Sequence, residues 1–81
     1  MAAVGLTLYT RPGCHLCDEM KAVVQPVARE LGCGVDEIDI TGDATLEARF
    51  AEEIPVLFID GRKAFKYRLT ERELRKQLTK K

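Results

Sequence analysis

Two cysteines separated by two residues, Cys14 and Cys17, are the side chains of this 81-residue sequence best suited to chemistry. Pro12 and Gly13 precede them and an apolar pattern with helical spacing follows, so we expect Cys14 where a strand turns into a helix. Unpaired N–H groups and the helix dipole stabilise a thiolate there, and cysteines in such positions have pKa values lowered to roughly 3.5–7.5. Cys14 is therefore predicted to be an attacking thiolate.

Cys17 stands three residues further along the expected helix, on the same face of its first turn as Cys14. Two cysteines in this arrangement can close a disulfide. We therefore expect Cys14 to attack a substrate disulfide and form a mixed disulfide, which Cys17 resolves by attacking Cys14 and releasing the reduced product. Both steps need two thiols, and no bound cofactor is predicted.

His15 lies between the two cysteines and has two interpretations. A protonated imidazole beside the thiolate would favour ionisation of Cys14 and make the oxidised form less stable. Alternatively, His15 is an exposed residue at a helix start with no part in the chemistry. The direction of its side chain decides between them.

A Cys-x-x-Cys pair also forms half of many zinc sites, so metal binding is the alternative function. A four-ligand site needs two further ligands, and beyond the pair the sequence offers only Cys33 and His15. His15 is poorly placed for joint ligation because it stands between the cysteines. No metal ligand is therefore predicted, and the alternative takes the form of a metal or iron–sulfur cluster held through Cys14 between two subunits. Cys33, between Gly32 and Gly34, is expected to be a small turn residue.

The elements that must position the pair follow from apolar spacing and from turn residues. Alternation over 4–10 predicts a strand that ends before Pro12-Gly13. Apolar residues at three- and four-residue steps then predict a helix from Cys14 to a stop at Gly32, kinked at Pro26. The remaining expected elements are a strand over 34–40, a short helix holding Leu46 and Phe50, a buried strand over 56–59, a turn at Asp60–Gly61, a returning strand over 63–67, and a helix from the Thr70–Glu73 capping box to near Gln77.

This order of elements, β-α-β-α-β-β-α, predicts an α/β fold of the thioredoxin-like, glutaredoxin type: a four-stranded mixed sheet flanked by three helices. We expect the first connections to be right-handed crossovers. A chain of 81 residues has room for a single domain, over 1–81.

The charge of the chain is zero overall but unevenly divided: residues 1–60 hold 4 Lys or Arg and 11 Asp or Glu, and residues 61–81 hold 9 and 2. Leucines interrupt the basic segment at helical spacing and no aromatic residue follows Tyr67, which favours a solvated helix face over a nucleic-acid or acidic-partner surface. No apolar run approaches about 18 residues and no signal segment is recognised, so we expect a cytoplasmic protein without membrane contact. In a reducing compartment a close cysteine pair is more often catalytic or metal-binding than structural.

Two motifs about 40 residues apart give the chain a family resemblance. The segment from Thr10 to Cys17, followed by Ile54-Pro55-Val56-Leu57-Phe58-Ile59-Asp60-Gly61, resembles a glutaredoxin-like member of the thioredoxin superfamily over nearly the whole chain. The resemblance implies that the Ile54–Pro55 bond is cis and faces the cysteines, and that the Ile54 backbone pairs with an extended substrate. It also implies that Arg11 holds a glutathione carboxylate.

The chain departs from the glutaredoxin pattern where that family holds the γ-glutamyl group. Phe65 and Arg68 lie in the region of a Gly-Gly and an acidic pair, and the Pro and Tyr usual between the cysteines are missing. The resemblance therefore implies a thiol–disulfide oxidoreductase that acts on disulfide-bearing proteins or small-molecule disulfides. A reductase or glutathione would serve as its electron donor.

Overall fold

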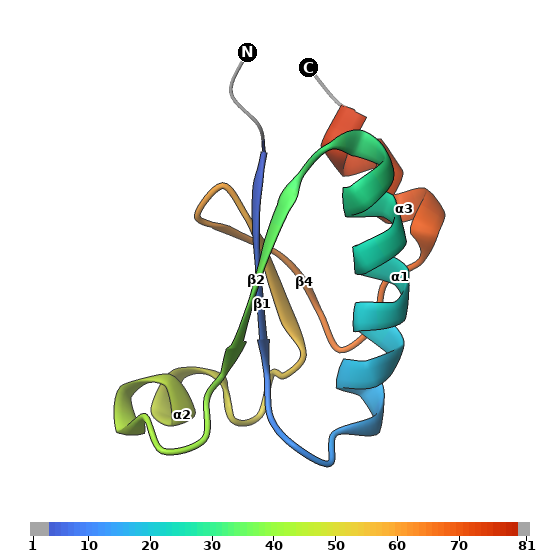
Figure 1. Cartoon of the computed structure of the whole chain (residues 1–81). Helices are drawn as coiled ribbons and strands as arrows, with labels where there is room; N and C mark the ends of the chain where they lie inside the picture. The colour runs from blue at the N-terminus through green and yellow to red at the C-terminus, as the bar shows by residue number, and fades with distance from the viewer. Residues whose placement is uncertain (1–3, 80–81) are drawn as a thin grey trace.

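The computed structural model describes residues 4–79, and three helices and four strands fill this range (Figure 1). Element limits differ from the expected ones by one or two residues, as is usual at fraying ends. In chain order the elements are β1 (Gly5–Thr10), α1 (His15–Leu31), β2 (Gly34–Asp39), α2 (Ala44–Phe50), β3 (Val56–Ile59), β4 (Arg62–Lys66) and α3 (Glu71–Thr79).

The four strands form one mixed sheet in the order β2-β1-β3-β4. β1 pairs in parallel with β2 and antiparallel with β3, and β3 pairs antiparallel with β4. The α/β fold class predicted from the sequence is therefore confirmed. The expectation of more than one crossover between parallel strands was wrong: only β1-α1-β2 joins parallel neighbours in this sheet, because β3 runs against both β1 and β2.

The sheet has helices on both faces, with α1 and α3 on one side and α2 on the other (Figure 1). One core cluster lies between the sheet and the α1–α3 layer and includes Leu8, Val24, Leu57 and Leu74. A second cluster joins Cys17 and Ile54 to the α2 side of the molecule. The cysteine end of α1 thus belongs to a different packing unit from the rest of that helix.

α1 begins at a cysteine cap and ends at a left-handed glycine. Gly32 has φ 74°, and its N–H and that of Cys33 bond to carbonyls of the last turn. Pro26 lies inside the helix without ending it, and the kink expected there stays a prediction. Five α1 residues are buried: Cys17, Met20, Val24, Val27 and Ala28.

α3 begins at the expected capping box. The Glu73 N–H donates to Thr70 Oγ1 (3.1 Å) and the Thr70 N–H donates to Glu73 Oε1 (3.0 Å). Leu69 and Leu74, on either side of this cap, pack in the same core cluster. Within residues 4–79, no helix has the length and apolar character needed to cross a membrane.

Candidate active site

Cys14 and Cys17 form a disulfide at the start of α1. Cys14 is the cap residue of the helix, with φ −91° and ψ 111°, and its Sγ accepts the Cys17 N–H at 3.1 Å. The Cα atoms of the pair are 5.2 Å apart. A sulfur at this point lies at the positive end of the helix dipole, where negative charge is stabilised.

The two cysteines differ in exposure. Cys14 is partly exposed, whereas only 3% of Cys17 is accessible, because Cys17 points into the second core cluster. A substrate can therefore reach the first sulfur and not the second. This difference matches an attacking and a resolving thiol.

Ile54 and Pro55 lie close to the pair, although they follow it by about 40 residues in sequence. Ile54 packs in the same cluster as Cys17 and Cys14, and the Ile54–Pro55 peptide bond is cis. The Ile54 N–H donates to the Phe50 carbonyl (3.1 Å), and the Pro55 carbonyl accepts the Tyr67 N–H (2.8 Å). The structure thus brings together the two motifs that carry the family resemblance.

An aromatic cluster supports the site from the α2 side. Phe50 is 1% exposed and stacks on Tyr9 at 4.6 Å between ring centroids, and Phe58 packs edge-on against Phe50 at 5.7 Å. The same cluster contains Cys17 and Ile54. Sequence reasoning missed this support because the three rings come from different elements and have no common spacing.

His15 pairs with Glu19, one turn further along the same helix. Its Nε2 lies 2.9 Å from Glu19 Oε2, and 87% of the side chain is exposed. A carboxylate at that distance offsets the charge of a protonated imidazole, which reduces any influence on Cys14. The geometry favours the interpretation of His15 as an exposed helix-start residue.

Arg11 is exposed and lines a cavity of about 290 Å³ on the Cys17 side of the pair. The same cavity is lined by Asp18, Glu37 and Asp39, so the cation has acidic neighbours. The Thr41 N–H donates to Asp39 (2.8 Å) and holds the pKa of that carboxyl below its ordinary value. The structure therefore places Arg11 beside the cysteines, within an otherwise acidic wall.

Cys33 is a partly exposed free thiol at the far end of α1. Its N–H closes the helix on Ala28, in keeping with the expected turn role. Across residues 4–79, no three His, Cys, Asp or Glu side chains come together in a way that could hold a metal ion.

Comparison with known proteins identifies the family. The model of the glutaredoxin-like domain (DUF836) matches residues 5–79. The chain belongs to this family. A glutaredoxin-like relative, the YDR286C homolog of Dictyostelium discoideum, is 31% identical over 78 residues that cover 89% of this chain and 72% of the relative.

Solved structures share the fold of this chain. Protein Ne2328 from Nitrosomonas europaea superposes with a TM-score of 0.81 at 27% identity, covering 98% of this chain and 95% of Ne2328. Thioredoxin from Fasciola hepatica has a TM-score of 0.63 at 18% identity, covering 95% of this chain and 79% of that protein, and shows the shared fold. Family and fold, together with the Cys-x-x-Cys pair, support a redox role.

Proposed function

We propose that this glutaredoxin-like protein is a thiol–disulfide oxidoreductase in which Cys14 attacks and Cys17 resolves. The observation that carries the proposal is the pairing of a partly exposed Cys14 at the start of α1 with a buried Cys17 in disulfide reach. The positive end of the helix favours the thiolate form of the outer sulfur.

In the first step the Cys14 thiolate attacks one sulfur of a substrate disulfide. The substrate S–S bond breaks, a mixed disulfide forms with Cys14, and the other substrate sulfur leaves as a thiolate that takes a proton from water. In the second step the Cys17 thiol loses its proton and attacks Cys14, which releases the remaining substrate sulfur as a thiol. Two electrons pass to the substrate, and the protein is left as the disulfide seen in the structure.

Substrate binding falls to the groups around the pair. Because the Ile54 N–H is already bonded to Phe50, pairing with an extended substrate would use the Ile54 carbonyl oxygen. The cis bond to Pro55 fixes the direction of the chain at Ile54, and Arg11 offers a cation to a substrate carboxylate. Disulfide-bearing proteins and small-molecule disulfides are the substrate class, with glutathione or a reductase as electron donor in a reducing compartment such as the cytoplasm.

Two serine variants test the proposal. Wild-type protein reduced with dithiothreitol should reduce a protein disulfide, Cys14→Ser should lose this activity, and Cys17→Ser should accumulate a mixed disulfide with the substrate, visible by mass spectrometry. Activity that survives intact in Cys14→Ser would refute the proposal. Supplying electrons from glutathione with its reductase, or from thioredoxin reductase, then identifies the donor.

A further inference from the structure

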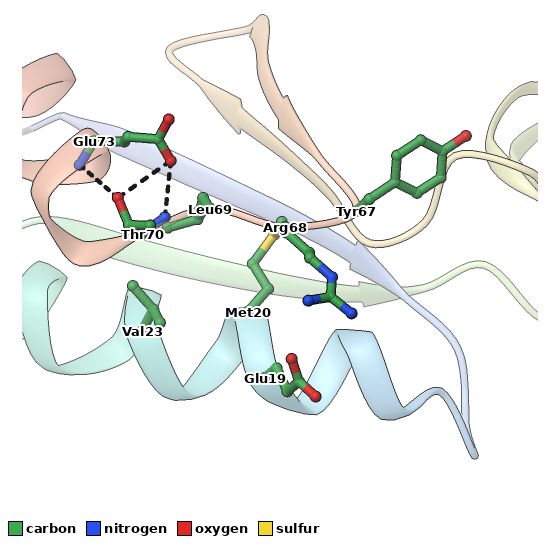
Figure 2. Close-up of a pocket in the computed structure, with 8 residues that line it drawn as sticks. All are labelled: Glu19, Met20, Val23, Tyr67, Arg68, Leu69, Thr70 and Glu73. Atoms are coloured by element: carbon green, nitrogen blue, oxygen red, sulfur yellow. Dashed lines mark hydrogen bonds between the residues drawn. The ribbon is translucent and has the colours of Figure 1, made fainter.

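A second cavity, of about 280 Å³, lies between α1 and the segment that joins β4 to α3 (Figure 2). Figure 2 shows the Arg68 side chain pointing from that segment toward α1, and the Met20 side chain pointing from α1 toward the segment. Tyr67 points away from the cavity. Besides Tyr67, the lining residues form an apolar floor of Met20, Val23 and Leu69, and a polar rim of Glu19, Arg68, Thr70 and Glu73.

Two elements of the cysteine site also form the walls of this cavity: helix α1, and the segment hydrogen-bonded to Pro55. Met20 follows Cys17 by three residues on one face of α1. On the opposite wall, the Tyr67 N–H is bonded to the Pro55 carbonyl (2.8 Å). Six helical residues from Cys14 to Met20 span about 9 Å, a distance that an extended chain covers in about three residues. A polypeptide bound at Cys14 can therefore place its third residue from the cysteine over the cavity.

The floor of the cavity suits an apolar side chain. Met20 is 2% exposed and its thioether is flexible, so the floor can adapt to different shapes. The cavity has a volume of about 280 Å³, which leaves room for an apolar side chain of a bound polypeptide.

The rim does not offer an anion site. An uncapped α3 N-terminus would present free N–H groups to an anion, but here the Glu73 carboxylate accepts the Thr70 N–H (3.0 Å) and Thr70 Oγ1 accepts the Glu73 N–H (3.1 Å). The rim also holds two carboxylates, those of Glu19 and Glu73, and one cation, Arg68. Even with His15 paired to Glu19, the rim carries no net positive charge. The two carboxylates of glutathione find little to bind there.

We propose that this cavity binds an apolar side chain of a polypeptide substrate, about three residues from the cysteine that Cys14 attacks. Protein disulfides are then preferred over glutathione mixed disulfides. The inference rests on the proposed oxidoreductase function and deepens it by naming the substrate class.

The test is a single-turnover reaction of the pre-reduced full chain. Each probe is a peptide whose one cysteine is held in a mixed disulfide with thionitrobenzoate, and the third residue on both sides of the cysteine is either leucine or serine. Cys14 bonds to the peptide sulfur and releases the coloured thionitrobenzoate anion, and Cys17 then releases the peptide thiol. The leucine peptide should react about fivefold faster than the serine peptide and than the glutathione–thionitrobenzoate disulfide.

Two substitutions of Val23, in the floor of the cavity, test whether the cavity causes the preference for leucine. Val23→Asp places a charge in the floor and Val23→Phe fills the space without one, so both should abolish the leucine preference. Arg72→Ala, an exposed α3 change outside the cavity, should retain it. Equal rates for leucine and serine peptides, a preference that survives both Val23 variants, or glutathione reacting as fast as the leucine peptide would each overturn the inference. Failure of every probe to react faster than with Cys14→Ser would instead refute the proposed function.

Discussion

Cys14 and Cys17 have different surroundings although only two residues separate them. Cys14 caps the helix from outside its hydrogen-bonded turns, so its sulfur stays partly in solvent. Cys17 lies one turn inside, where the helix rotates its side chain toward Phe50 and Ile54. The Cys14 sulfur is therefore accessible to a substrate disulfide, whereas the buried Cys17 sulfur can react only with Cys14.

His15 provides a test of which residues control the reactive sulfur. Because its imidazole is exposed and lies beside Glu19, its effect on Cys14 should be weak. In reduced His15→Ala, the rate of Cys14 alkylation by iodoacetamide at pH 7 should stay within about twofold of wild type, since screened surface charges contribute little. Peptide mapping by mass spectrometry measures the rate at Cys14 separately from Cys33. A tenfold slower reaction would show that the imidazole acts on the thiolate.

At the scale of elements, the start of α3 depends on the capping box formed by Thr70 and Glu73. Thr70 and Glu73 satisfy each other's N–H groups, and this places Leu69 and Leu74 in the core. The capping box is local in sequence, so it is predictable from four consecutive residues. The same segment forms one wall of the substrate cavity, which links the helix start to the site.

Removing the cap should therefore destabilise the fold measurably. Thr70→Ala loses the side-chain acceptor of the first turn, which costs about 1 kcal/mol. For a domain of this size that corresponds to a melting temperature lower by about 4–8 °C, read by circular dichroism. Thr79→Ala is the matched control, because Thr79 donates only to the Arg75 carbonyl within the last turn. Equal melting temperatures in the two variants would contradict the role of the cap.

The contact between α1 and α3 adds a dependence on pH. Arg75 donates two hydrogen bonds to the Glu30 carboxylate (2.7 and 2.9 Å) and holds the pKa of Glu30 below its ordinary value of 4.5. A carboxyl whose pKa is lowered by folding stabilises the protein above its unfolded pKa, and this stabilisation is lost as the pH falls through the folded pKa. Arg75 also pairs with Glu71 on its own helix.

Arg75→Gln should thus melt a few degrees below wild type at pH 7, and the gap should narrow as the pH falls below 4.5. Thermal unfolding of both proteins across this range measures the gap. Salt at about 1 M should narrow it as well, because both partners reach solvent. Arg72→Gln, an exposed neighbour on the same helix, should show no such pH dependence. A gap that persists unchanged in acid would mean that the pair with Glu30 does not couple the helices.

At the scale of the whole molecule, the order of elements was predictable and part of their arrangement was not. Apolar spacing, caps and turn residues are local signals, and they placed seven elements and the cysteine pair correctly. Strand direction and the position of side chains from distant elements depend on tertiary packing. No local pattern could show that β3 runs against β2, or that Arg68 would share a cavity with Glu19.

The basic segment, residues 61–81, forms ion pairs with the acidic part of the chain. Part of the basic segment is held in ion pairs with the acidic part: Lys63 contacts Glu53, and Arg75 contacts Glu30. The hydrogen bond from Lys63 holds the pKa of Glu53 below its ordinary value. The segment thus helps to fix β4 and α3 on the fold, while Lys80 and Lys81 lie outside the described residues.

The aromatic cluster connects the far side of the sheet to the site, which suggests a final prediction. Phe50 packs with Cys17 and Ile54, and its carbonyl accepts the Ile54 N–H. Phe50→Leu should lower the free energy of unfolding by about 1–3 kcal/mol through lost packing and aromatic contact. It should also slow both steps of the single-turnover reaction several-fold: thionitrobenzoate release because Ile54 loses a fixed neighbour, and release of the peptide thiol because Cys17 does.

Leu74→Val separates this local effect from a loss of stability. Leu74 is as buried as Phe50 but belongs to the cluster under α1 and α3, away from the second cluster. Its truncation by one methyl-sized group should cost about 0.5–1.5 kcal/mol and leave both release rates unchanged. Urea unfolding and single-turnover kinetics on both variants give the two quantities independently. If both variants slow the reaction in proportion to their loss of stability, the reaction depends on overall stability, and Phe50 has no specific role in positioning Ile54 and Cys17.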